Sequence, residues 1–320
     1  MDSEGRAIPK RFLSLVQLFL ILILFAAAPR YVLPYHIISL TSIFMYITLT
    51  VSWAVFSGPT QYMSLASAAF FGIGIYISAI LGKVLFLPVV IGLGGFISFL
   101  LALLVGLSSL RLKGMYFTIF TFGLSELIRH FVRWWEVNQT GTVGRWVVHV
   151  NPKVVYYVML VIVLMTLAVS YMIKRSKFGL ALRSIGQSEE AADHIGINVN
   201  AVKIVIFAIS TFFMGAAGAI MATRWTYIDP SIAFNPLFSF MPVLMAIFGG
   251  IGNIYGQILG AAVLTFLADV LLTKFPYYYM LLYGIIMVIV VLFLPNGIIG
   301  LKEKILRLWT ADRMRLYANT

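Results

Sequence analysis

The feature that most constrains the fold is a succession of apolar runs, many of them about 20 residues long. A run of that length crosses the roughly 30 Å hydrocarbon core of a bilayer as a helix. Membrane barrels show shorter alternating segments of about ten residues instead, and this chain has none. We expect ten spans, with the ranges 12–28, 37–57, 62–81, 84–107, 115–133, 154–173, 203–223, 237–250, 256–273 and 277–295.

Composition agrees with an all-α polytopic membrane protein of eight to ten transmembrane helices. The chain is 61% hydrophobic and 11% charged, whereas soluble domains are about 25% charged. We expect a single transmembrane domain over residues 1–320. Cysteine is absent, which excludes disulfides and thiolate metal sites. The four histidines are not spaced as metal ligands, so no metal site is expected.

The basic residues predict the orientation. The net charge is +12, and a membrane protein carries its excess Lys and Arg on cytoplasmic loops. An even number of spans puts both termini on one side. With the termini in the cytoplasm, most of the 23 Lys and Arg residues fall there too, together with the 174–203 loop and the tail, 296–320. The charge thus indicates a cell-membrane protein in a lipid bilayer, with no nucleic-acid partner.

Two regions are rich in small residues and in helix breakers, residues 58–81 and 240–264. By the predicted topology they cross in opposite directions, which is typical of an inverted repeat. Interrupted segments at corresponding positions of two halves indicate a transport site. Tight helix packing without solute contact is the alternative. The expected pathway residues are Ser64, Ser67, Gly72, Gly74, Glu126, Gly249, Gly250, Gly252 and Asn253.

Two carboxylates fall inside predicted spans, where charge is unfavourable and often functional. Glu126 precedes Arg129 and His130 by three and four residues, so all three share one helix face. We favour a structural ion pair there, and a pore-lining role is the alternative. Asp269 is expected near the outer end of its span, paired with Lys274 or hydrated.

The longest polar interruption, 174–203, contains two short helix patterns. Ser176 is placed to cap a helix that runs to about Ile185, where Gly186 would stop it. Ser188 is placed to cap a second one.

The second helix has its own start and stop residues. Glu189 and Glu190 occupy its first turn, where negative charge complements the helix dipole. Gly196 ends it, and Asn198 or Asn200 can cap the next span. A preformed helical projection of this kind predicts a docking surface, whereas a solvated connector is the alternative.

The run KFGLALRSIGQSEEAADHIGINVNAVK resembles the cytoplasmic loop of branched-chain amino acid ABC transporter permeases of the LivM type. The resemblance extends through SLASAAFFGIGIYISAIL, RLKGMYFTIFTFGLSELIR, FGGIGNIYGQILGAAVL and LPNGIIG. Departures from the family pattern fall in the expected pathway, at Ala66, Ser67, Asn253 and Gln257. These four departures affect the expected identity of the solute more than the resemblance to the family.

The resemblance implies one half of a channel in an ATP-driven importer of branched-chain amino acids. Its implied partners are a homologous permease, two ATP-binding cassette ATPase subunits and an extracellular solute-binding protein. The chain has no phosphate-binding loop, so ATP would be bound by the partners and the chain would not be an enzyme. The implied coupling residues are Gly179, Arg183, Glu189, Glu190, Ala191, Ala192, Ile195 and Gly196.

Three other functions are compatible with such a chain. One is a permease of the same architecture for urea, short amides or another small solute. The second is a transporter driven by an ion gradient, which usually carries more intramembrane carboxylates. The third is a membrane enzyme, which would need a cluster of reactive side chains that the sequence lacks.

Overall fold

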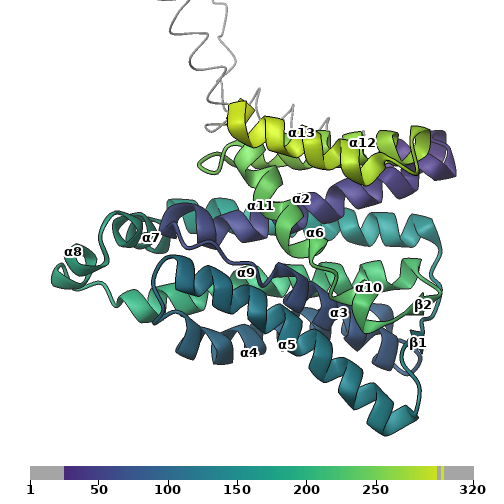
Figure 1. Ribbon diagram of the computed structural model, residues 1–320, viewed down its shortest axis with the longest axis horizontal. Coiled ribbons are helices and arrows are strands. Elements are labelled where there is room, and N and C mark those ends of the chain that lie inside the picture. The colour runs from purple at the N-terminus through teal and green to yellow at the C-terminus, as the bar shows by residue number, and fades with distance from the viewer. Residues whose placement is uncertain (1–24, 294–296, 299–320) are drawn as a thin grey trace, which may run out of the picture.

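Helices make up nearly all of the computed structural model, which describes residues 25–293 and 297–298 (Figure 1). The two short strands, β1 (Arg145–Trp146) and β2 (Tyr227–Ile228), pair antiparallel. The helices are α2 (Pro34–Thr60), α3 (Ser67–Leu81), α4 (Leu87–Ser109), α5 (Met115–Thr140), α6 (Pro152–Arg175), α7 (Lys177–Gln187), α8 (Glu189–His194), α9 (Val199–Met221), α10 (Pro230–Ala233), α11 (Leu237–Gly249), α12 (Ile254–Lys274) and α13 (Tyr279–Phe293).

Nine of the ten predicted spans coincide with helices. Most of the first, 12–28, and the predicted tail, 296–320, lie outside the described residues. Six described helical segments are long and apolar enough to cross a membrane, and α3 and residues 279–289 form shorter apolar helices. α5 is not among the six, because Glu126, Arg129 and other charged side chains interrupt it. The prediction of an all-α polytopic membrane protein is confirmed.

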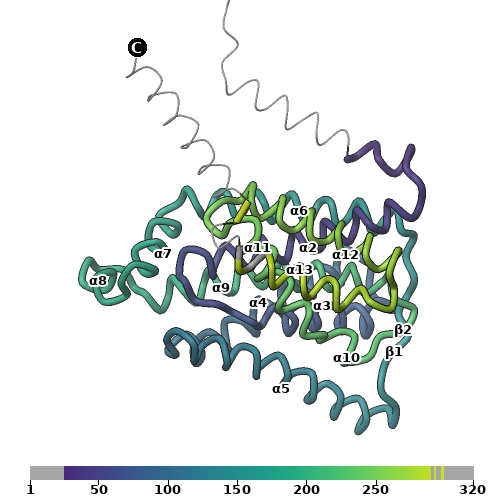
Figure 2. Tube along the Cα trace, turned by 45° about the horizontal axis from the view of Figure 1, so that its top comes forward, coloured from purple at the N-terminus to yellow at the C-terminus, as the bar shows by residue number. Residues whose placement is uncertain are grey.

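The helix α9 packs against α2, α3 and α4 in the interior of the bundle, and the trace beyond its first residues extends into α8 and α7 at one end (Figure 2). Almost every residue from Ile206 to Met221 is buried. Close approach depends on glycines, since a Cβ on Gly74 would collide with the carbonyl of Gly215. Small residues allow helix backbones to pack tightly in a membrane, where apolar burial gives no advantage over lipid.

The bundle has two ends of different character. At one, here called the loop end, α7 and α8 project from the helices (Figure 1). At the other, here called the strand end, β1 pairs with β2 and the amide of Val147 donates to the carbonyl of Thr226. The helix ends alternate between these two ends, as the predicted topology requires.

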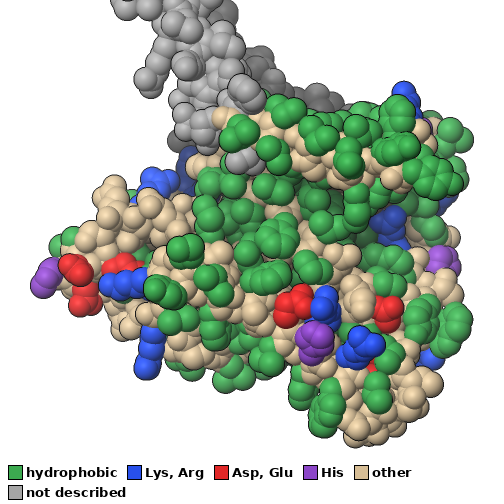
Figure 3. Space-filling model, in the orientation of Figure 1, with side chains coloured by type: hydrophobic (Ala, Val, Ile, Leu, Met, Phe, Trp, Pro, Cys, Tyr) green, Lys and Arg blue, Asp and Glu red, His purple; other side chains and the backbone are tan. Residues whose placement is uncertain are grey.

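The bundle surface is mainly apolar, and charged side chains gather in two places, on α7 and α8 and over α5 (Figure 3). Exposed apolar side chains line α4, α12 and α13, among them Leu104, Phe266 and Leu281. Such a surface suits lipid or another membrane helix better than water.

One predicted boundary is wrong. The span expected at 62–81 becomes helical only at Ser67, and residues 61–66 have non-helical backbone. Gln61 has a left-handed φ of 62°. The apolar pattern continues through this segment, but its backbone groups bond to side chains of neighbouring helices, as described below.

Candidate functional site

The connection between α6 and α9, residues 176–198, is here called the projection. Its second helix forms as predicted, with Ser188 accepting a 3.2 Å hydrogen bond from the Ala191 amide. Gly196 follows α8 with a φ of 85°, a conformation that glycine adopts without steric cost. Asn198, and not Asn200, caps α9, because its side chain accepts from the Ala201 amide at 3.0 Å.

The first helix of the projection differs from the prediction in two details. Ser176 precedes α7, but its hydroxyl donates to the carbonyl of Ile173 at 2.8 Å and does not cap α7. Gly186 lies inside α7 and does not end it. Its role is close packing, since a Cβ there would collide with the carbonyl of Pro59 at the end of α2.

A buried lysine fixes the projection to the membrane helices. The Lys203 side chain is 2% exposed, and its ammonium lies 2.8 Å from the carboxylate of Glu189. It also donates to the carbonyl of Leu110 at 3.2 Å. The hydroxyl of Tyr62 donates to the same Glu189 oxygen at 2.6 Å, and its ring lies under the ammonium, 4.6 Å from it. The network therefore joins α8 and α9 to the connection between α2 and α3, through Tyr62, and to the connection between α4 and α5, through Leu110.

The electrostatics favour an ionised Glu189. Burial opposes this and raises its pKa, but hydrogen bonds from Lys203 and Tyr62 lower it, and the net pKa is below the ordinary value. Burial is also the largest cause of the raised pKa of Tyr62, with the Glu189 carboxylate adding to it. The phenol thus stays protonated and remains a donor to the carboxylate.

The expected coupling residues divide into two groups. Gly179 and Ala192 are buried and pack the projection against the bundle, and Glu189 anchors it. The others point to solvent, and Ile195, 71% exposed, is an apolar side chain at the tip. The exposed members are Arg183, Glu190, Ala191, Ile195 and Gly196.

The non-helical segment 61–66 meets α11, the helix that leads into the second broken region, inside the bundle. The hydroxyl of Ser239, on α11, donates to the Leu65 carbonyl at 2.7 Å and accepts from the Ala68 amide at 3.0 Å. Thr121, on α5, accepts from the Leu65 amide at 2.9 Å. The indole of Trp53 donates to the Ser64 carbonyl at 2.7 Å. Irregular backbone is tolerated in a membrane protein when such partners satisfy it.

Two of the expected pathway serines line a small polar cavity. Ser64 and Ser67 face Ser57, Ser210 and other residues around a space of about 10 Å³. The hydroxyls of Ser57 and Ser67 have no hydrogen-bond partner among the described residues. A space of this size and polarity is suited to a single water molecule.

The expected pathway glycines are in less open surroundings. A Cβ on Gly72 would collide with the Phe234 ring, and one on Gly249 with the carbonyl of Gly256. Together with Gly74, they occupy positions where helices or loops touch.

Other expected pathway residues form the connection between α11 and α12 at the loop end. Gly250 has a φ of 104°, and Lys174 donates to the Gly252 carbonyl at 3.4 Å. Asn253 caps α12, accepting from the Tyr255 amide at 3.1 Å. Gln257, another departure from the family pattern, donates to the Ile251 carbonyl at 2.6 Å. These polar side chains organise the turn.

The ion pair predicted for Glu126 is confirmed, because its carboxylate lies 2.5 Å from Arg129. Of the two alternatives for Asp269, the pair with Lys274 does not form among the described residues. Side chains five residues apart do not share a helix face, unlike those three or four apart. The hydroxyl of Ser39, on α2, donates to the Asp269 carboxylate instead.

Sequence reasoning missed Glu136, which is completely buried near the strand end. Its carboxylate accepts from the Gly144 amide at 2.8 Å, from Arg145 at 3.1 Å and from the Tyr76 hydroxyl at 3.3 Å. Glu136 and Arg145 are nine residues apart, on either side of a turn, and no helix spacing rule predicts that pair. The contacts fix the turn that leads into β1.

Comparison with known proteins identifies the family. The family described as branched-chain amino acid transport system, permease component, matches residues 35–291. The chain belongs to this permease family. Among its relatives is the high-affinity branched-chain amino acid transport system permease protein LivM of Salmonella typhimurium, 26% identical over 84% of this chain and 71% of the relative. LivM of Escherichia coli is 26% identical over 82% of this chain and 70% of that protein.

The chain is also similar, over part of its length, to a sugar import permease. The ribose import permease protein RbsC of Haemophilus influenzae is 29% identical over 42% of this chain and 42% of its own length. No solved structure matches the chain. The resemblance read from the sequence is confirmed, and the chain is a multi-pass transport permease.

Proposed function

We propose that this permease forms one half of the channel of an ATP-driven importer for branched-chain amino acids. The relatives that match most of the chain are named as permeases of branched-chain amino acid transport systems. In this proposal a homologous permease completes the channel. Two ATP-binding cassette ATPase subunits and an extracellular solute-binding protein complete the importer, and ATP binds only to the ATPases.

The observation that carries the proposal is the anchored projection. Lys203 holds α8 through Glu189, while Gly186 packs α7 on the end of α2. A preorganised surface loses little conformational entropy when it docks. Ile195 at its tip is apolar and exposed, which suits insertion into a pocket of a partner. The projection would seat in an ATPase surface, and closure of the ATPases would move the helices attached to it.

Orientation follows from the basic residues. The loop end carries Arg111, Lys113, Lys174, Arg175 and Lys177, and cytoplasmic loops carry such an excess. We therefore place the loop end and both termini in the cytoplasm, and the strand end outside. The solute-binding protein would deliver its ligand to the strand end.

A second candidate is a permease for another small solute, such as a sugar, urea or a short amide. The similarity to a ribose import permease over 42% of the chain favours keeping it. The two candidates share the architecture and the coupling to ATPases. They differ in the solute that the binding protein delivers.

Reconstitution tests the proposal. The permease, its partner permease, the ATPases and the binding protein are assembled in proteoliposomes, and uptake of labelled leucine is measured with and without ATP on the ATPase side. Uptake should require ATP. Ile195→Asp should lower the uptake rate about tenfold or more, as expected when a central interface contact worth about 1.4 kcal/mol is lost.

Lys177→Asp is the matched control, since Lys177 is an exposed residue of α7 that is not among the expected contacts. It should transport at close to the wild-type rate. Uptake without ATP, or full activity of Ile195→Asp, would contradict the coupling role. ATP-dependent uptake of a sugar or urea in place of leucine would favour the second candidate.

A further inference from the structure

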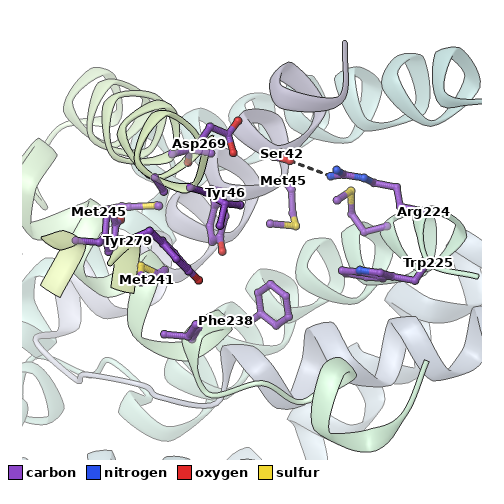
Figure 4. Close-up of a pocket in the computed structure, with 16 residues that line it drawn as sticks. Ser42, Met45, Tyr46, Arg224, Trp225, Phe238, Met241, Met245, Asp269 and Tyr279 are labelled. Carbon is purple, nitrogen blue, oxygen red and sulfur yellow. Dashed lines mark hydrogen bonds between the residues drawn. The ribbon is translucent and has the colours of Figure 1, made fainter. Parts of the chain in front are cut away.

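A cavity of about 290 Å³ lies between α2, α9, α11, α12 and α13 (Figure 4). Much of its wall is apolar and built from Met45, Met221, Met241, Met245 and Phe238. Its volume is far larger than the roughly 30 Å³ that one water molecule occupies in the liquid. It has room for a small solute, unlike the 10 Å³ serine cavity beside α3.

Two opposite charges lie on the side of this cavity that faces the strand end. Arg224 follows the last turn of α9, and Asp269 lies five residues before the end of α12. Both line the cavity, and Arg224 reaches from one wall toward Ser42 (Figure 4). They are not a salt bridge, because no contact within 4.0 Å joins them among the described pairs.

Each charge is positioned by a serine of α2. The guanidinium of Arg224 donates to the Ser42 hydroxyl at 2.9 Å, and this is its only hydrogen bond to a described side chain. Ser39 donates to one carboxylate oxygen of Asp269. A guanidinium has five N–H donors and a carboxylate has about four acceptor positions. Both groups therefore keep most of their hydrogen-bonding capacity for another partner.

The wall also contains an unsatisfied polar group. The hydroxyl of Tyr283 is buried and has no hydrogen-bond partner among the described residues, although Tyr283 lines the cavity. Buried hydroxyls normally have a partner. Charged residues in membrane helices are unfavourable and usually line a substrate path. The set of charges, hydroxyl and apolar wall thus indicates a ligand with matching chemistry.

We propose that this cavity is a transit site for the zwitterion of a branched-chain amino acid. The proposal rests on the proposed import function. The α-carboxylate pairs with Arg224, the α-ammonium pairs with Asp269, and the aliphatic side chain packs among the methionines. Two separated charges of opposite sign match a zwitterion, whereas a sugar or urea carries no charge for either. Methionine side chains adapt to differently shaped apolar groups, which suits leucine, isoleucine and valine together.

Neutralising either charge tests the site in the reconstituted importer. Arg224→Gln and Asp269→Asn should each lower ATP-driven leucine uptake about tenfold or more, because each variant removes a charged hydrogen-bond partner of the solute. Lys274→Gln, an exposed residue at the end of the same helix as Asp269, should transport normally. Uptake by both variants within twofold of the wild type would overturn the proposal and leave the importer function intact.

Cysteine labelling gives a second test that does not depend on these variants. The chain has no cysteine, so one can be placed at Ala268 in the cavity wall or at Ala261, which is buried on the same helix outside the cavity. A water-soluble cationic thiosulfonate should modify Ala268→Cys and not Ala261→Cys, and saturating leucine should slow the modification. Unchanged labelling in the presence of leucine would overturn the transit site.

The two failures are distinguishable. If the wild-type importer takes up no branched-chain amino acid, the proposed function fails, and the ligand class fails with it. If it takes up leucine, but neither charge-neutralised variant lowers that uptake and leucine does not slow the labelling of Ala268→Cys, only the transit site fails. Protection of Ala268→Cys by ribose or urea and not by leucine would also overturn the zwitterion assignment.

Discussion

The ammonium of Lys203 lies 2.8 Å from the carboxylate of Glu189, so that the first turns of α9 hold the start of α8. Lys203 is 2% exposed and Glu189 is 20% exposed. A pair of this kind is a stronger constraint than a surface ion pair, because removing one partner leaves a partly buried charge without compensation.

Lys203→Met should therefore destabilise the permease. We expect a loss of about 3 kcal/mol, at the low end for one partner of a buried pair, since Glu189 still reaches some water. The unfolding temperature in detergent measures the effect. The double variant with Glu189→Gln should recover part of the loss. Lys177→Met, on the exposed surface of α7, is the control and should change little. Equal unfolding temperatures for all variants would contradict the anchoring role.

The projection should loosen in acid. The net pKa of Glu189 is below its ordinary value of 4.5, so its contribution to stability is fully present above that value and is lost as the pH falls through the lower, folded-state pKa. Hydrogen exchange of the α8 amides, corrected for intrinsic rates, should show constant protection at neutral pH and a fall below about pH 4.5. Glu189→Gln should be less protected at neutral pH and lack this transition. Equal pH profiles would exclude Glu189 as the titrating group.

Ser239→Ala should weaken the contact between the first broken region and α11. The substitution leaves the Ala68 amide without its hydrogen bond and removes one from the Leu65 carbonyl. A buried polar group without a partner costs about 1–3 kcal/mol. Thermal unfolding should detect this loss. Ser108→Ala is the control, because that hydroxyl is exposed and bonds only to its own helix. Similar unfolding temperatures for the two variants would argue against a role for Ser239.

Alanine at two glycines should have opposite effects. At Gly74 the added Cβ collides with the Gly215 carbonyl, and α3 has to move away from α9; overpacking of this kind costs about 1–3 kcal/mol. At Gly92 no atom lies within 4 Å of the added Cβ, so alanine should stabilise α4 by up to about 1 kcal/mol through helix propensity. The yield of monodisperse protein and its unfolding temperature should fall for the first variant and hold or rise for the second. Parallel changes would contradict the packing described for α9.

The sequence predicts what local spacing determines. Ser188 caps α8 because its partner, Ala191, is three residues away, and Glu126 pairs with Arg129 over the same distance. The nine matching spans follow from apolar runs of sufficient length. Each of these features is decided within a few turns of one helix.

The features that sequence reasoning missed depend on tertiary packing. Tyr62 and Glu189 are 127 residues apart and share one hydrogen bond, and Ser239 reaches Leu65 across 174 residues. Nothing in the apolar pattern distinguishes 61–66 from helix, since the segment leaves the helix only where side chains of other helices satisfy its backbone. The cavity between Arg224 and Asp269 likewise requires the relative positions of α9 and α12.

The longest described helix has a mechanical consequence. α2 has 27 residues and therefore spans about 40 Å. Near one end, Pro59 abuts Gly186 of α7, and near the other, Ser39 and Ser42 hold Asp269 and Arg224. α2 is thus a rigid strut between α7 and the two hydroxyls that position Arg224 and Asp269. In the proposed importer, a displacement of the projection by its partner would reach the far end of the cavity through one continuous helix.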